Sequence, residues 1–134
     1  MMTGGCQCGA VRYELTGPPR DAYACHCNEC RKQSASAFGI SVLVDRTHLR
    51  ILQGETQVWS RPTDSGGTLF CHFCPDCGTR LWHIGSNDPE TVSVKGGSLD
   101  TPPDFDSLHH IWVGQKLSGL SLPSDATCHD KEPP

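Results

Sequence analysis

The stretch CPDCG at residues 74–78 carries two cysteines three positions apart, followed directly by a glycine. A C-x-x-C pair of this spacing supplies two of the four ligands of a tetrahedral zinc site. The glycine after the second thiol permits a left-handed turn and lets backbone N–H groups approach the sulfur atoms. The stretch therefore predicts half of a metal site, and the fold must bring a second pair of ligands to it.

The second pair is expected in CQCG at residues 6–9, which has the same trailing glycine and also leads into a strand. Together the two stretches predict a four-thiolate zinc site that joins the N-terminus to the middle of the chain. Its ligands would be Cys6, Cys8, Cys74 and Cys77. Redox chemistry is the alternative for a C-x-x-C pair, but it would need a thioredoxin-like βαβ context. No such pattern is visible, so the spacing favours zinc.

A third group occurs in CHCNEC at residues 25–30, where Cys25, Cys27 and Cys30 can face one metal ion. Structural zinc takes four protein ligands, whereas catalytic zinc keeps one position for water or substrate. Three sulfurs therefore predict a second zinc with an open position, which suits a thiol substrate. The alternative is closure by another protein ligand. The candidates are Cys71, then His72, His83 and His26, with Cys128 and His129 less favoured.

Cys71 also has a second interpretation, because free cysteine is among the residues most often buried as a small apolar side chain. The sequence leaves both interpretations of Cys71 open, and with them the choice between an open and a closed second site.

The composition describes one domain with a thin core. The chain has 134 residues, of which 36% are hydrophobic, and it contains 14 Gly and 10 Pro. Such a chain is expected to need cross-links or metal for stability. The net charge of −4 argues against a nucleic-acid partner, which calls for clustered Lys and Arg.

The expected localisation follows from two absences. No apolar run approaches the roughly 18 residues of a membrane span, and no secretory signal is visible. The protein is therefore expected in the cytoplasm. Nine cysteines in that reducing compartment indicate metal or redox work instead of disulfides.

Alternating apolar residues predict short strands. Val11, Tyr13 and Leu15 alternate with polar residues, as in a half-buried strand. A helix is expected only over residues 28–37, and an irregular tail over 121–134. The pattern predicts an all-β fold in a single domain over residues 1–120. Further strands are expected at 38–44, around Leu49, Ile51 and Val58, and at 68–73, 81–85, 91–97 and 109–113.

The three cysteine groups, in this order, resemble the glutathione-dependent formaldehyde-activating enzyme family, whose fold is Mss4-like with short, mostly antiparallel sheets stapled by zinc. The motifs are C-x-C-G, C-H-C-x-x-C-R-K and F-C-x-x-C-G, with HIWV near the end. The resemblance implies a structural zinc at Cys6, Cys8, Cys74 and Cys77, and a second zinc at Cys25, Cys27 and Cys30, near which glutathione binds. The chain departs from the family pattern at Ala35, where a glycine is usual, and at Cys71, where a basic or polar residue is more frequent.

The resemblance also implies an activity. Members are carbon–sulfur lyases that interconvert formaldehyde plus glutathione with S-hydroxymethylglutathione. Glutathione would bind with its thiolate at or beside the zinc of Cys25, Cys27 and Cys30, the catalytic group, and attack the formaldehyde carbonyl. A proton would come from water, His26 or His72.

Arg31 and Lys32 are the candidates for binding the glutathione carboxylates, although a solvated helix face explains them equally well. The His109-His110 pair is interpreted as a surface feature at a strand end.

Two other functions remain open. One is a non-catalytic zinc-binding module that binds a protein partner. The other is a thiol-dependent enzyme acting on another small electrophile or on a glutathione adduct. The sequence gives no indication of oligomeric state.

Overall fold

The computed structural model describes residues 1–133, which form short strands, 3-10 turns and one α-helix. The prediction of an all-β, mostly antiparallel fold is confirmed. The strands are β1 (Met2–Gly5), β2 (Arg12–Leu15), β3 (Asp21–Cys25), β4 (Gly39–Asp45), β5 (Leu49–Gln53), β6 (Gln57–Pro62), β7 (Thr68–Phe73), β8 (Arg80–Gly85), β9 (Asp88–Lys95) and β10 (His109–Ile111). The helix is α1 (Asn28–Ser34), and the 3-10 turns are η1 (Arg46–His48), η2 (Gly96–Ser98), η3 (Phe105–Ser107) and η4 (Val113–Gln115).

The chain divides into two compact units, and each is described by itself. Unit 1 comprises Met1–Asp21 and Val42–Pro102. Unit 2 comprises residues 22–41 and the described residues from 103 onward. The boundaries of the predicted domain and tail, 1–120 and 121–134, remain predictions.

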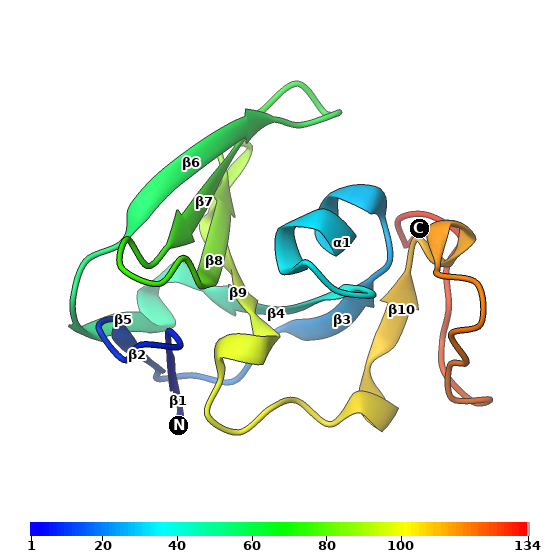
Figure 1. The fold of residues 1–134 in the computed structure, drawn as a ribbon, viewed down its shortest axis with the longest axis horizontal. Helices are drawn as coiled ribbons and strands as arrows, with labels where there is room; N and C mark the ends of the chain where they lie inside the picture. Colours follow the sequence, from blue (N-terminus) through cyan, green and yellow to red (C-terminus); the bar gives the residue numbers. More distant parts are fainter. Residues whose placement is uncertain (134) are drawn as a thin grey trace. The chain divides into compact units, whose positions relative to one another are not determined.

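Unit 1 contains two sets of antiparallel strands. A three-stranded sheet has the order β1-β2-β5, and the other strands follow the order β4-β9-β8-β7-β6. Figure 1 shows β6, β7 and β8 side by side in green. Strand β6 forms the outer edge of this order, which explains why most of its side chains are exposed.

The core of unit 1 forms where strand β2 faces strand β8. Val11, Tyr13 and Leu15 are at most 1% exposed, so the predicted alternation is confirmed. The Tyr13 ring meets the edge of Trp82, with ring centroids 5.7 Å apart. Burial of one such aliphatic side chain, Leu15, contributes about 1.5–3 kcal/mol.

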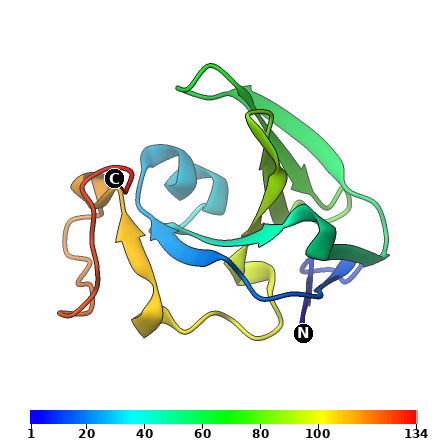
Figure 2. The same cartoon turned by 180° about the vertical axis from the view of Figure 1, so that it is seen from behind.

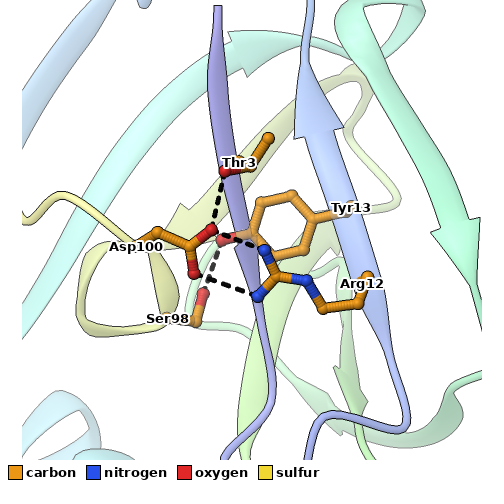
Figure 3. A network of polar contacts seen from close by, with 5 residues as sticks. All are labelled: Thr3, Arg12, Tyr13, Ser98 and Asp100. Carbon is orange, nitrogen blue, oxygen red and sulfur yellow. Dashed lines mark hydrogen bonds and ion pairs between the residues drawn. The ribbon is translucent and has the colours of Figure 1, made fainter.

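A polar network fixes the N-terminal strands to the segment after β9 (Figure 3). Asp100 accepts hydrogen bonds from both guanidinium nitrogens of Arg12, at 3.0 and 2.5 Å, and from the Thr3 hydroxyl at 2.6 Å. The Arg12 guanidinium lowers the pKa of Asp100 to about 2. Beside them, the hydroxyl groups of Tyr13 and Ser98 lie 2.6 Å apart. Strand β1 is thereby held in place immediately before Cys6.

Unit 2 is built on a parallel pair of strands, β3 and β10, in which Ile111 lies opposite Cys25. Helix α1 follows β3 directly. The C-terminal segment, orange to red in Figure 2, runs along β10. The His110 N–H donates to the Thr127 carbonyl and the His129 N–H to the His110 carbonyl, both at 2.8 Å. The C-terminal segment is therefore attached to β10, the strand that pairs with β3 beside Cys25.

Helix α1 ends earlier than the predicted residue 37, at Ser34. Ala35 is its C-cap and has a left-handed backbone with φ of 51°. Its N–H donates to the Lys32 carbonyl at 3.1 Å, and the Ser36 N–H donates to the Arg31 carbonyl at 3.2 Å. Positive φ is the conformation that glycine adopts without cost, which gives a physical reason for the glycine expected there.

Replacing Ala35 by glycine is expected to stabilise the protein by about 0.5–1 kcal/mol. An L-residue in this conformation costs roughly 1–2 kcal/mol, and the greater freedom of glycine in the unfolded chain offsets part of the gain. Thermal unfolding measures the effect. Ala37→Gly is the matched control, because its φ is not positive, and it should lower stability. Equal shifts for the two variants would contradict the explanation.

Candidate metal centres

The four cysteines of the predicted structural site come together in unit 1. Their sulfur atoms all lie within 4.8 Å of one another. The Cys6 and Cys8 sulfurs are 3.6 Å apart, and those of Cys8 and Cys74 are 3.8 Å apart. Tetrahedral zinc with Zn–S bonds of about 2.3 Å requires sulfur separations of about 3.8 Å. The geometry of the group therefore fits a four-thiolate zinc ion.

Two similar loops hold these sulfurs. In the first, the Val11 N–H donates to the Cys6 sulfur at 3.2 Å, and Gly9 has φ of 82°. In the second, the Asp76 N–H donates to the Cys74 sulfur at 3.4 Å, and Gly78 has φ of 81°. Both trailing glycines thus adopt the left-handed turn predicted for them, and backbone N–H groups approach the sulfurs. Such bonds orient thiolate ligands.

The electrostatics of the second loop favour a thiolate. A hydrogen bond from the Thr79 hydroxyl, together with the Thr79 N–H, lowers the pKa of Cys77 to about 5. The thiolate is the form that binds metal. The Gln7 N–H also donates to the Thr79 hydroxyl oxygen at 3.1 Å, so one side chain connects the two loops.

The three remaining predicted ligands come together in unit 2. The sulfurs of Cys25, Cys27 and Cys30 lie within 4.8 Å of one another, and those of Cys25 and Cys27 are 3.4 Å apart. Cys25 ends β3 and Cys27 is the N-cap of α1, where its sulfur accepts the Cys30 N–H at 3.3 Å. The loop before α1 and the first turn of the helix therefore bring the three sulfurs close together.

Within this trio the Cys27 sulfur is the preferred site of negative charge. Hydrogen bonds from the Cys25 and Cys30 thiols lower the pKa of Cys27 to about 2, and the Cys30 N–H acts in the same direction. The thiol of Cys25 has a raised pKa, because it is hydrogen-bonded to Cys27 and Cys30 and is buried. A divalent cation would remove this competition by favouring the thiolate form of all three ligands.

The candidate fourth ligands of unit 2 lie outside the group of three sulfurs. Among the described residues of unit 2, no other His, Cys, Asp or Glu joins the three sulfurs as a metal-binding group. His26 lies in unit 2, but its Nε2 is 2.9 Å from His110 Nδ1. Cys128 is exposed and lies opposite His110 in an isolated bridge. Among the described residues of unit 2, three sulfurs are therefore available as ligands at this site.

The other candidate ligands belong to unit 1. Cys71 is completely buried on β7, as the interpretation as a small core residue requires. The His72 ring stacks on Trp82, with its Nδ1 2.8 Å from the Thr56 hydroxyl. His83 is buried and its Nε2 lies 3.0 Å from Arg80 Nη1. Closure of the second site by one of them remains a prediction.

Arg31 and Lys32 both lie on α1. Arg31 is half-buried and donates to the Asn28 side chain at 3.0 Å, whereas Lys32 is exposed. Their part in ligand binding remains a prediction.

His110 does not lie at the surface, where the His109-His110 pair is predicted. Its side chain is completely buried, so this prediction is wrong for His110. Neighbouring residues of a strand point to opposite faces, so one member of such a pair can be buried while the other is not. Burial lowers the pKa of His26 to about 4 and also lowers the pKa of His110. Burial therefore disfavours the charged form of both rings.

Comparisons with known proteins agree with the motifs. A sequence model described as "Glutathione-dependent formaldehyde-activating enzyme" matches residues 1–115. A Halomonas elongata protein named "Putative glutathione-dependent formaldehyde-activating enzyme" is 29% identical over an alignment of 118 residues, and the match covers 78% of this chain and 71% of that protein.

A solved structure supports the fold. The crystal structure of a Rhodobacter sphaeroides protein, determined in structural genomics, has a TM-score of 0.58 and 24% sequence identity. The match covers 96% of this chain and 99% of the other. At this level of identity the likeness concerns the fold alone.

Proposed function

Because the chain belongs to the glutathione-dependent formaldehyde-activating enzyme family, we propose that it is a carbon–sulfur lyase that joins glutathione to formaldehyde. The observation that carries the proposal is the trio of Cys25, Cys27 and Cys30, which no further His, Cys, Asp or Glu joins among the described residues of unit 2. The four-sulfur group of unit 1 is proposed to hold a structural zinc, and the trio a second zinc.

A zinc ion held by these three sulfurs would favour the deprotonated form of a thiol that binds beside them. The role of the chain is to hold the three sulfurs in place. Cys27 is fixed by the Cys30 N–H, and Cys25 by strand β3. Arg31 and Lys32, on the same helix, are proposed to pair with the carboxylates of glutathione.

The proposed reaction is a balanced addition. The glutathione thiol releases its proton to water, the resulting thiolate sulfur forms a bond to the carbonyl carbon of formaldehyde, and the electron pair of the C=O π bond moves to oxygen. That oxygen takes a proton, which gives S-hydroxymethylglutathione. Water is the proposed proton source, since His26 is completely buried. The site would accelerate this easy addition mainly by holding the two reactants together.

The proposed location is the cytoplasm, where thiols remain reduced. No helix in residues 1–133 combines the length and the apolar character needed to cross a bilayer.

Metal content measured during a glutathione titration tests the proposal. We expect two zinc ions per chain and saturable glutathione binding by calorimetry. Cys27→Ser should lose one zinc and the glutathione binding. Cys128→Ser is the control, because Cys128 is exposed and belongs to neither sulfur group, and it should retain both.

The formation of S-hydroxymethylglutathione, followed by NMR with labelled formaldehyde, tests the chemistry. Glutathione binding without acceleration of this reaction would indicate another electrophile. Two zinc ions with no glutathione binding would contradict the proposal and favour a zinc-stabilised module that binds a protein partner.

A further inference from the structure

Two histidines far apart in the sequence form a buried pair in unit 2. His26 and His110 are each 0% exposed, and His26 Nε2 lies 2.9 Å from His110 Nδ1. Phe38 and Phe105 enclose them, with ring centroids 5.1 Å from His26 and 5.2 Å from His110, respectively. The pair therefore lies in an apolar environment, where a hydrogen bond is strong and an unpaired polar atom is costly.

The hydrogen bonding of this pair is incomplete. His26 Nδ1 and His110 Nε2 are buried and have no hydrogen-bond partner among residues 1–133. A neutral imidazole has one donor and one acceptor nitrogen, so the shared bond forces both rings into the same tautomer. One unpaired donor and one unpaired acceptor then remain at the outer ends. An apolar pair of similar size would avoid this cost, so global stability does not explain the histidines.

The position of the pair suggests what it does. His26 is the residue between Cys25 and Cys27, and its N–H donates to the Ile111 carbonyl at 3.0 Å. Its ring bonds to His110, the residue before Ile111. His110 and Ile111 therefore bind both the ring and the backbone N–H of His26, the residue between Cys25 and Cys27.

The segment of residues 110–115 also binds Asn28, the residue after Cys27. The Asn28 N–H donates to the Gln115 side-chain oxygen at 2.8 Å. Cys27 therefore lies between two residues, His26 and Asn28, that are each tied to residues 110–115. Since Cys27 is also the N-cap of α1, these ties fix the sulfur relative to the helix that carries Cys30.

We propose that His26 and His110 are positioning residues, whose hydrogen bond holds the peptide between Cys25 and Cys27 so that three sulfurs converge on one metal ion. This inference rests on the proposed function only in taking the trio as a metal site. It gives His110, in the C-terminal segment of unit 2, a role in the geometry of that site. Substitution of a residue that orients metal ligands without binding the metal typically lowers metal affinity by about 10–100-fold.

Metal affinity of the trio is the direct test. His110→Leu removes the bond and keeps the site apolar, and we expect zinc to bind there about 10–100-fold more weakly, measured by competition with a chromophoric chelator. The four-sulfur site of unit 1 is the internal reference and should keep its affinity. His109→Leu is the matched control, because His109 precedes His110 on the same strand and is outside the pair.

A conservative pair of substitutions separates positioning from general destabilisation. In His26→Gln with His110→Asn, the glutamine amide nitrogen takes the place of Nε2 and the asparagine oxygen that of Nδ1, so the bond is retained. This double variant should recover most of the affinity. Cobalt bound in place of zinc should show the wild-type d–d absorption in the double variant and an altered spectrum in His110→Leu.

The outcomes are distinct. Unchanged affinity and cobalt spectrum in His110→Leu would overturn the proposal, as would equal loss of both metals. If His110→Leu fails to fold, His110→Met replaces it, because it also removes the hydrogen bond to His26 and its flexible apolar side chain adapts to the available space. It should weaken the second site alone, and an unchanged site would again overturn the proposal. Saturating zinc should restore glutathione addition in His110→Leu, whereas loss of a proton donor would not be rescued.

Discussion

Replacing Cys8 by serine is expected to remove one zinc ion per chain and most of the stability of unit 1. Cys8 is exposed, so its side chain contributes little packing. At an ordinary exposed position a serine would change the free energy of unfolding by no more than about 0.5 kcal/mol. A structural zinc, in contrast, contributes about 10–16 kcal/mol in small zinc domains, as much as or more than the whole stability of a typical domain.

Cys128→Ser provides the comparison that isolates the metal. Cys128 is also exposed, but it belongs to neither sulfur group. We expect this variant to keep two zinc ions and to unfold at the wild-type temperature. Zinc analysis and thermal unfolding measure both variants. If Cys8→Ser were as stable as Cys128→Ser, the four sulfurs of unit 1 would not hold a structural metal.

Much of the metal-site geometry was predictable because cysteine pairs are local patterns. The spacing of Cys74 and Cys77, with a glycine behind them, specifies a turn by itself. The partner loop at residues 6–9 has the same features, and a tetrahedral site needs two such halves. The structure then brings all four sulfurs within 4.8 Å, although 66 residues separate Cys8 from Cys74.

The elements that the sequence did not predict depend on distant partners. Strand β1 reads Met-Thr-Gly-Gly, which has no alternation, and it exists because it pairs with β2 and is held by Asp100. Strand β3 likewise depends on its parallel partner β10. Local propensity carries no information about such partners.

The hydrogen bond between His26 and His110 joins residues 84 positions apart, and no sequence motif predicts it.

Apolar residues predict a strand around Val58 but not how exposed that strand is. Val58 and Trp59 are about half exposed, because β6 is an edge strand. Hydrophobic pattern identifies strands better than it identifies their place in a sheet.

Replacing Gly4 by alanine is expected to destabilise unit 1 by about 1–3 kcal/mol, the cost of overpacking a close contact. A Cβ atom at Gly4 would lie 2.5 Å from the Tyr13 hydroxyl and 2.6 Å from the backbone oxygen of Ser98. The Tyr13 hydroxyl is held by Ser98, as Figure 3 shows, so it cannot move aside without breaking a buried hydrogen bond. The backbone oxygen is less able to move.

Gly97→Ala is the matched control for Gly4→Ala. Gly97 lies in η2, next to Ser98, and a Cβ there would meet nothing within 4 Å. Since its φ is not positive, alanine should leave the free energy of unfolding unchanged or raise it by about 0.4–1 kcal/mol. Chemical denaturation measures both variants. Because β1 leads directly to Cys6, Gly4→Ala should also weaken zinc binding at the four-sulfur site and leave the trio unaffected. Equal stability of the two variants would mean that the contact between β1, Tyr13 and Ser98 does not hold the N-terminal loop in place.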